Sequence, residues 1–286
     1  MIRGLHPSFR DVLARGGLVK VAGAHNALGA VLAERAGFHA VWSSSFEVSA
    51  ARCLPDASLL TMTDYLEAAV HMQRAVGVPV VADCDSGFGN ELNFAHLVHE
   101  YEASGITAVC VEDKLFPKMN SFVGEDQRLV DAEVFARRIA VAKQAQRGED
   151  FLVIARTEAF IAGLGLEEAL RRCHTYADAG ADAVLVHSKQ STEVEVAAFL
   201  ARWVRDVPVA VVPTTYPAWH AEDAHRAGAA IVIYANQGLR AQVLALRHTF
   251  GEIVRAGHTA GVESGIATLD DIFTLQGLEA WRKLAR

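Results

Sequence analysis

No segment of the sequence is apolar over the length needed to cross a bilayer, and its first residues contain no apolar core of a signal peptide. Cysteine is also scarce, and the few cysteines are widely spaced without any Cys-x-x-Cys pair. This spacing favours reduced thiols over a disulfide or zinc framework. We therefore expect a soluble, cytoplasmic protein with no membrane partner. The cysteines are Cys53, Cys84, Cys110 and Cys173.

Basic clusters are missing as well. The formal net charge is −7, no run of five like charges occurs, and no stretch rich in Lys and Arg indicates a nucleic-acid partner. An acidic protein that binds an anionic small molecule must concentrate positive charge locally, through a few Arg and Lys side chains or a metal ion.

No linker rich in Gly, Ser or Pro divides the chain, so we expect one domain over residues 1–286, with residues 236–286 as a C-terminal helical segment. Eight short apolar runs, rich in β-branched residues, alternate with longer segments of helical period. The expected strands are 18–24, 40–44, 78–83, 108–112, 151–156, 183–187, 207–213 and 229–234. The expected helices are 27–36, 64–75, 94–104, 132–146, 166–179, 192–202, 236–255 and 269–286.

Four similar joints connect helices to strands, at 36–37, 104–105, 179–180 and 227–228. Each is a small residue followed by Gly, which supplies the left-handed conformation that ends a helix, and an apolar run follows at once. Unbroken apolar strands indicate burial on both faces of a parallel sheet. Eight such units favour a closed (β/α)8 barrel over an open doubly wound sheet, and the last helix is surplus to the eight units.

Polar residues follow the expected strands, at the barrel end where catalytic groups usually lie. Asp83 and Asp85 are two residues apart, so on a strand both would point into the barrel mouth. With Glu112 they supply oxygen ligands suited to Mg²⁺, some of them acting through water. Alternatively, two of the three only cap loops or pair with Arg156 or Lys114. The glycines at 87 and 89 lack a P-loop pattern and indicate a tight turn.

Cations and a long loop lie near the same end. Arg156 follows a strand and has a planar fork that suits phosphoryl oxygens, although it can also pair with Glu158 or Glu112. His187 can donate a hydrogen bond or act as acid or base. The stretch 114–128 has no helical period, and it carries Lys118, Asn120 and Ser121. It reads either as a lid over a bound anion or as a solvated insertion.

The segment 112–121 reads EDKLFPKMNS and matches the EDK-x5-NS signature of phosphoenolpyruvate phosphomutases. The chain resembles this family, within the isocitrate lyase superfamily, over roughly the whole barrel. Further matching pieces are Ala24-His25-Asn26, Trp42 with Ser44, Asp83-x-Asp85-x-Gly87-x-Gly89, Ala155-Arg156-x-Glu158-Ala159, His187-Ser188 and Val212-Pro213-Thr214.

The resemblance implies a reversible isomerisation of phosphoenolpyruvate to phosphonopyruvate, with Mg²⁺ as cofactor. It implies that Asp85 lies closest to the metal, that Asp83 and Glu112 complete its acidic surroundings, and that Asp56 lies just beyond them. It also implies a homotetrameric dimer of dimers that exchanges a C-terminal helix. The resemblance assigns Trp42, Ser44, Ser45, Ser121 and Ser188 to substrate binding, and Asp56, Lys118, Asn120, Arg156 and His187 to catalysis.

The sequence departs from the family pattern near the second strand, where Ser43 and Ser45 stand at positions that are usually Gly. These side chains lie beside the expected carboxylate site, so a mutase for a carboxylated phosphoenolpyruvate stays open. Phosphonopyruvate hydrolase is the nearest rival, but such relatives lack the complete Asn-Ser element of the loop. A methylisocitrate lyase would carry a catalytic Cys in the loop, and a non-catalytic scaffold would not need this set of charged residues.

Overall fold

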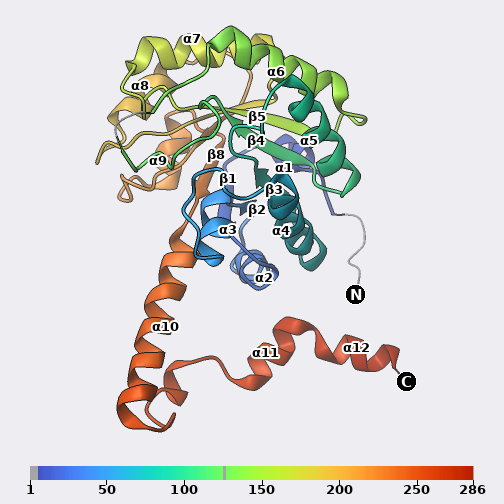
Figure 1. Cartoon of the computed structure of the whole chain (residues 1–286), viewed down its shortest axis with the longest axis vertical. Coiled ribbons are helices and arrows are strands. Elements are labelled where there is room, and N and C mark those ends of the chain that lie inside the picture. The colour runs from blue at the N-terminus through green and yellow to red at the C-terminus, as the bar shows by residue number, and fades with distance from the viewer. Residues whose placement is uncertain (1–5, 125–126, 286) are drawn as a thin grey trace.

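A closed barrel of eight parallel strands organises the chain (Figure 1), in a computed structural model that describes residues 6–124 and 127–285. Each strand pairs with the next one along the chain, and β8 pairs with β1. The expected (β/α)8 barrel is therefore confirmed. The strands are β1 (Val19–Ala24), β2 (Ala40–Ser43), β3 (Val80–Asp83), β4 (Ala108–Glu112), β5 (Leu152–Thr157), β6 (Ala183–Val186), β7 (Val209–Val211) and β8 (Ile231–Tyr234).

All eight predicted strands are present, most of them trimmed by one or two residues at one or both ends. Their two faces are buried in different places. Inward side chains such as Trp42, Cys110 and Leu185 fill the barrel interior, while outward ones such as Val41, Val109 and Val184 pack under the helices. Burial on both faces explains why these strands read as unbroken apolar runs rather than as alternating ones.

The barrel helices follow the predicted alternation, with three short helices that periodicity did not predict. Those three, α1, α3 and α9, are only six or seven residues long and offer too few turns for a periodic signal. The helices are α1 (Phe9–Ala14), α2 (Ala27–Arg35), α3 (Ser45–Ala51), α4 (Met62–Ala75), α5 (Glu91–Ala103), α6 (Ala132–Ala145), α7 (Gly165–Asp178), α8 (Val194–Arg202) and α9 (Ala221–Arg226).

The four predicted helix-to-strand joints are also confirmed. Gly37, Gly105, Gly180 and Gly228 have φ values of 92°, 85°, 99° and 114°, in the left-handed region where a residue with a side chain is strained. The chain reverses at each of these glycines and enters the next strand. These four joints precede β2, β4, β6 and β8, and because all eight strands are parallel, their carboxyl ends lie at the same mouth of the barrel, where the polar side chains gather.

The last part of the chain leaves the barrel as an arm (Figure 1), formed by α10 (Gln237–Ala256), the short turn Glu263–Gly265, α11 (Leu269–Gln276) and α12 (Leu278–Leu284). Gly277, with φ of 67°, splits the single helix expected at 269–286 into two, and Arg286 lies outside the described residues. No residue of α10 is buried. The arm returns to touch the barrel at α2, where Arg35 Nη2 donates to Thr274 O over 3.2 Å.

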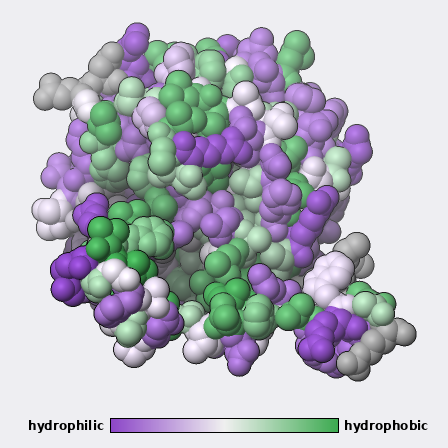
Figure 2. Space-filling view, turned by 60° about the horizontal axis from the view of Figure 1, so that its bottom comes forward, coloured by the Kyte–Doolittle hydropathy of each residue, from purple (hydrophilic) through white to green (hydrophobic). Residues whose placement is uncertain are grey.

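Large apolar side chains are exposed along this arm, and the face that contains it shows contiguous hydrophobic residues (Figure 2). Val254 of α10 is 85% exposed and Leu269 of α11 is 73% exposed. Burying such side chains is favourable by about 1.5–3 kcal/mol each, so an exposed series of them is typical of a surface that packs against another chain. Within the described residues, no helix combines the length and apolarity that a membrane span needs.

Candidate active site

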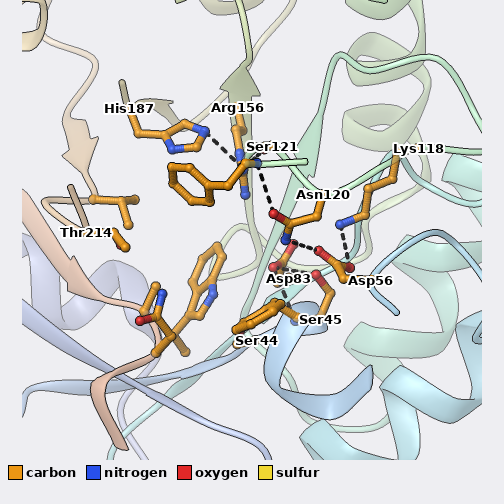
Figure 3. Close-up of a pocket in the computed structure, with 16 residues that line it drawn as sticks. Ser44, Ser45, Asp56, Asp83, Lys118, Asn120, Ser121, Arg156, His187 and Thr214 are labelled. Carbon is orange, nitrogen blue, oxygen red and sulfur yellow. Dashed lines mark hydrogen bonds and ion pairs between the residues drawn. The ribbon is translucent and has the colours of Figure 1, made fainter. Parts of the chain in front are cut away.

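A cavity of about 280 Å³ opens at the carboxyl ends of the strands (Figure 3). Ten of the residues singled out from the sequence line it, so the fold brings together positions up to 145 residues apart. These ten are Trp42, Ser44, Ser45, Asp56, Asp83, Lys118, Asn120, Ser121, Arg156 and His187. The rest of the lining, which the sequence reasoning did not assign to the site, is Phe46, Phe122, Val212, Thr214, Ala235 and Asn236.

Asp83 and Ser45 form the acidic wall of this cavity. Ser45 begins α3, and both its backbone N–H (3.2 Å) and its hydroxyl (2.8 Å) donate to Asp83 Oδ2. Burial raises the pKa of Asp83, although the nearby charges of Arg156 and Lys118 oppose that rise. The hydroxyl of Ser45 is therefore committed to Asp83, and the residue that replaces the usual Gly adds no free donor to the cavity.

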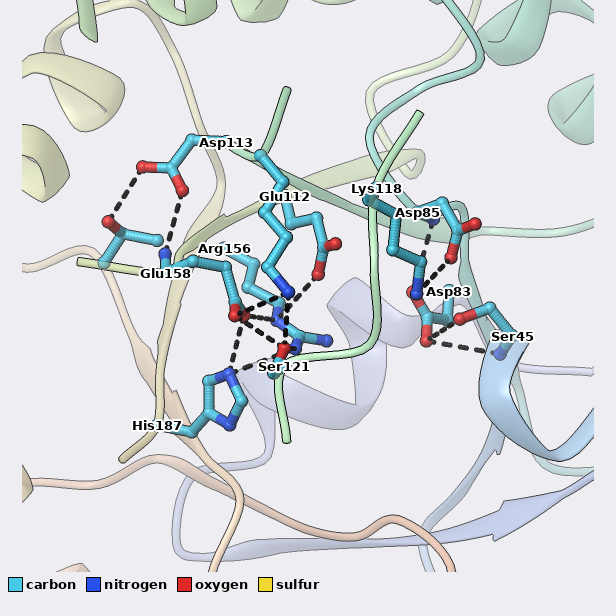
Figure 4. A network of polar contacts seen from close by, with 12 residues as sticks. Ser45, Asp83, Asp85, Glu112, Asp113, Lys118, Ser121, Arg156, Glu158 and His187 are labelled. Atoms are coloured by element: carbon cyan, nitrogen blue, oxygen red, sulfur yellow. Dashed lines mark hydrogen bonds and ion pairs between the residues drawn. The ribbon is translucent and has the colours of Figure 1, made fainter. Parts of the chain in front are cut away.

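Asp85 is placed by a turn and not by strand alternation, which corrects the reasoning from spacing. Strand β3 ends at Asp83, and Asp85 has φ of 50°, in the left-handed region. The turn continues through Gly87, as expected from its glycines, because a side chain there would collide with the ring of Phe94. Asp85 still reaches the site from behind, since its Oδ1 lies 3.0 Å from Lys118 Nζ (Figure 4), but it does not line the cavity.

The loop that follows β4 forms one wall of the cavity, and its described residues contain no helix; residues 125–126 lie outside the description. Lys118 Nζ donates to Asp56 Oδ1 over 2.7 Å, and Asn120 Nδ2 donates to Asp56 Oδ2 over 2.7 Å. Burial alone would lower the pKa of Lys118, but Asp85, Glu112 and Asp56 together hold it well above its usual value. Lys118 is therefore a charged ammonium group among carboxylates.

The wall beside Ser121 carries Arg156 and His187, which we call the cationic pair because of the charge of Arg156. Arg156 Nε lies 3.2 Å from Glu112 Oε2 and 2.5 Å from Glu158 Oε1, so both ion pairs considered from the sequence are present. His187 Nε2 lies 2.6 Å from Glu158 Oε1 and 3.0 Å from Arg156 Nη2. A single ring nitrogen cannot donate to the carboxylate and accept from the guanidinium at once. We assign the proton to Nε2, because the contact with the carboxylate is the shorter one.

Two carboxylates in this region have unmet hydrogen-bonding capacity, which bears on a metal. In the described part of the chain, both oxygens of Asp85 and Oε1 of Glu112 are buried and accept no hydrogen bond, although Asp85 Oδ1 is in an ion pair with Lys118. Burial raises the pKa of Asp85 to about 7, which reflects the cost of a buried carboxylate that only Lys118 offsets. Hard oxygen donors in this state fit a divalent cation such as Mg²⁺. Within residues 6–124 and 127–285, however, no group of three His, Cys, Asp or Glu side chains is arranged so that it could hold a metal ion without movement.

Glu112 and Ser188 join Asp85 as predicted site residues that do not line the cavity. Glu112 is buried behind Arg156. Ser188 donates from Oγ to Glu195 Oε2 over 2.5 Å and accepts from Gln190 N, so its hydroxyl is already engaged at the start of α8. Ser44 lines the cavity while its Oγ accepts from Glu47 N over 3.3 Å as the N-cap of α3.

Glu158 contacts several groups of the site, but the sequence alone did not indicate a role of its own for it. It was considered only as a partner of Arg156, yet it is fully buried and contacts Arg156, His187, Ser121 and Lys114. The available signal was a carboxylate directly after an apolar strand, which is costly to bury unless cations surround it.

The family model described as phosphoenolpyruvate phosphomutase matches residues 9–254. The crystal structure of phosphoenolpyruvate phosphomutase from Streptomyces platensis subsp. rosaceus is 53% identical, with a TM-score of 0.95 over 96% of each chain. The phosphonopyruvate hydrolase of Variovorax sp. (strain Pal2) is 44% identical over 96% of each chain. A crystal structure of phosphonopyruvate hydrolase in complex with oxalate and Mg²⁺ is 43% identical, with a TM-score of 0.91 over 96% of each chain.

These similarities extend over the barrel and the loop together, and they agree with the arrangement of acidic and cationic groups around the cavity. The chain belongs to the phosphoenolpyruvate phosphomutase family.

Proposed function

We propose that the protein catalyses the Mg²⁺-dependent, reversible isomerisation of phosphoenolpyruvate to phosphonopyruvate. The observation that carries this proposal is the position of Asn120 and Ser121, which belong to the loop yet line the same cavity as Arg156 and His187. In this reaction the phosphorus–oxygen bond of phosphoenolpyruvate breaks and a bond from phosphorus to the methylene carbon forms. No atom is gained or lost, so a cavity that excludes water is the main requirement.

The substrate is anionic at both ends, and the cavity offers groups for each. Arg156 lies where it can hold phosphoryl oxygens, since the guanidinium presents a planar set of donors, and His187 lines the cavity beside it. Ser44 lines the cavity, and its hydroxyl, which accepts from Glu47 N, can donate to a carboxylate. The two groups face each other across a space of about 280 Å³, which suits a three-carbon phosphate ester.

Asp83, Asp85 and Glu112 would hold Mg²⁺, and the unmet oxygens of Asp85 and Glu112 support this assignment. Bound Mg²⁺ would supply positive charge to the oxygen atoms of the substrate and hold the pyruvyl portion in place. Lys118 and Asn120 would keep the loop over the cavity through their shared contact with Asp56. A phosphoryl group in transfer requires charge stabilisation and exclusion of water more than covalent help, and these residues provide both.

Hydrolysis of phosphonopyruvate to pyruvate and phosphate is the second candidate, favoured by the 44% identity to the Variovorax hydrolase. It requires a water molecule beside the phosphoryl group while the loop is in place. The loop contact of Asn120 with Asp56 favours the mutase because it closes that side of the cavity. A carboxylated substrate has less support, since Ser45 directs its hydroxyl to Asp83 and offers the additional carboxylate no free donor.

A phosphorus NMR time course with phosphonopyruvate, run with Mg²⁺ and with EDTA, tests the proposal. We expect a phosphoenolpyruvate signal that grows only when the metal is present. Inorganic phosphate as the first product would instead identify a hydrolase, and no reaction of phosphonopyruvate would overturn both activities.

We further propose that residues 1–286 act as one barrel domain whose C-terminal segment, residues 236–286, is exchanged with a second copy in a homotetramer built as a dimer of dimers. The exposed apolar side chains of α10 to α12 support this proposal. A second apolar groove, of about 430 Å³ between α2 and the start of α10, offers a complementary surface. Light scattering on the full chain and on a chain that ends at Ala256 tests it. A full chain that is monomeric at all concentrations would contradict it.

A further inference from the structure

Glu158 lies between the loop and the cationic pair, and its two carboxylate oxygens face different groups (Figure 4). Oε1 accepts from Arg156 Nε over 2.5 Å and lies 2.6 Å from His187 Nε2. Oε2 accepts from Ser121 Oγ over 2.6 Å and lies 3.4 Å from Lys114 Nζ. Oε1 therefore contacts Arg156 and His187, which would lie beside the phosphoryl portion of the substrate, and Oε2 contacts residues of the loop.

The loop side of this arrangement depends on Ser121. Its hydroxyl donates to Glu158 and accepts from Lys114 Nζ over 2.9 Å and from Arg156 Nη2 over 3.1 Å. Lys114 Nζ also donates to Met119 O over 2.8 Å, which ties a second point of the loop to the same ammonium group. If the part of the loop around Ser121 moved away, Glu158 and Lys114, which lies at the start of the loop, would lose these partners while they remained buried, which is costly.

The backbone around Glu158 is held by a separate buried carboxylate. Asp113 accepts from Glu158 N over 2.8 Å and from Thr157 Oγ1 over 2.9 Å. Asp113 itself is anchored by Tyr176 Oη at 2.6 Å and by Arg172 Nη1 at 3.1 Å, both from α7. Glu158 is thus fixed to the barrel, so changes in its contacts arise from the groups that approach it.

The charges around Glu158 favour its ionised form. Burial alone would raise the pKa of its carboxyl group, but Arg156, His187 and Lys114 together hold that pKa well below its usual value. A fixed negative charge that contacts Arg156, His187 and Lys114 redistributes its hydrogen bonds when one of its partners leaves. Loss of the Ser121 contact would therefore change the hydrogen bonds that Glu158 makes with Arg156 and His187.

We propose that Glu158 is a positioning residue that couples closure of the loop to the placement of Arg156 and His187, so that the phosphoryl-binding groups reach their working arrangement only when Ser121 is docked. This role rests on the proposed function. If the protein is a mutase, the coupling explains how the site avoids transferring the phosphoryl group to water while the loop is open. It assigns Ser121 to the loop contact, beyond a role in binding substrate.

A double-mutant cycle tests the coupling, with Glu158→Gln, Ser121→Ala and the combined variant. Phosphorus NMR gives the ratio of phosphate to phosphoenolpyruvate formed from phosphonopyruvate. Chymotrypsin cleavage after Phe122, a half-exposed loop residue, reports opening of the loop in the absence of turnover. Both assays run with and without oxalate and Mg²⁺. Glu167→Gln, which neutralises an exposed carboxylate on α7, is the matched control.

We expect Ser121→Ala and Glu158→Gln each to raise the cleavage rate and the phosphate fraction by about tenfold, the effect of one hydrogen bond to a charged group. The combined variant should resemble Glu158→Gln alone, and Glu167→Gln should match the wild type. Additive effects, or a loop whose cleavage rate does not change, would overturn the coupling.

The coupling can still be tested if Glu158→Gln does not fold or if the wild type has no mutase activity. If Glu158→Gln does not fold, the ¹⁵N resonance of the His187 ring, assigned by comparison with a His187→Gln variant, is recorded in wild type and Ser121→Ala. Coupling predicts that it shifts, and an unchanged resonance would overturn the proposal. If the wild type converts no phosphonopyruvate, the proposed function fails, whereas the cleavage and NMR measurements still decide whether the loop and the cationic pair are coupled.

Discussion

Asn120 donates a hydrogen bond from Nδ2 to Asp56 Oδ2 across 2.7 Å and thereby links the loop after β4 to the segment that follows α3. The other oxygen of Asp56 accepts from Lys118 at the same distance. A single buried carboxylate thus receives two of the three polar side chains, Lys118 and Asn120 but not Ser121, that the loop places at the cavity. The loop is therefore secured at Asp56 on one side and at Glu158 on the other.

Removing the side-chain amide of Asn120 should release the loop from Asp56. We expect Asn120→Ala to lower mutase turnover by about tenfold, because one hydrogen bond to a charged group is lost, and to raise the fraction of phosphate formed. Asn120→Asp should be more severe, since it sets a second carboxylate against Asp56. Phosphorus NMR measures both products. The exposed loop variant Val123→Ala is the control, and a product ratio in Asn120→Ala equal to that of the control would argue against the lid role.

Both oxygens of Asp85 are buried and accept no hydrogen bond, so a bound cation would stabilise this carboxylate. We expect Asp85→Ala and Asp85→Asn to abolish Mg²⁺-dependent turnover and to remove the stabilisation of the fold by Mg²⁺. That stabilisation amounts to about 2.7 kcal/mol at a concentration of 100 times Kd. Asn is the better folded variant, because it tolerates the left-handed backbone that strains Ala at φ of 50°.

Thermal melts with Mg²⁺ and with EDTA provide the measurement for Asp85, and Asp206→Asn changes an exposed carboxylate as the control. Normal activity in Asp85→Asn, or a Mg²⁺-induced rise in Tm equal to that of the control, would exclude Asp85 as the principal ligand.

Cys84 lies between the two aspartates but faces the hydrophobic core, with all four cysteines free. Burial raises the pKa of its thiol well above the usual value, so the reactive thiolate is suppressed. We expect Cys84→Ala to keep kcat and KM while it lowers the free energy of unfolding by about 1 kcal/mol through a small cavity. Urea unfolding and steady-state rates measure the two effects. Loss of activity in a folded variant would reveal chemistry at Cys84.

Asp64 caps the start of α4 and provides a test of acid stability. Its pKa is lowered to about 2 by hydrogen bonds from Thr61 and then from Arg52. A lowered pKa means that the stabilisation is present above about pH 4, the ordinary value for Asp, and is lost as the pH falls towards 2. We expect Asp64→Asn to cost about 0.5 kcal/mol at pH 7 and progressively less below pH 4. Urea unfolding at several pH values measures this difference. A constant difference would exclude the charge as its source, and Asp150→Asn is the exposed control.

Much of the barrel could be predicted from the sequence because its signals are local. The strand Ala108–Glu112 is an unbroken apolar run, and Gly105 supplies the left-handed joint before it. A glycine conformation or an apolar period is decided within a few residues, so it survives in any fold that contains it. The short helix α3 has no such period. It forms because Ser44 caps it and the barrel buries one face of it.

The site was predictable as a set of residue types and not as an arrangement. The sequence by itself determined the eight units, the acidic and cationic residues at the strand ends and the family signature in the loop. Only the tertiary structure decided that Asp85 arrives by a turn, that Ser45 is committed to Asp83 and that Ser188 turns to Glu195. It also decided that Glu158 joins the loop to Arg156 and His187. The physical reason is that a buried polar group takes its role from the partners that satisfy it, and those partners come from distant parts of the chain.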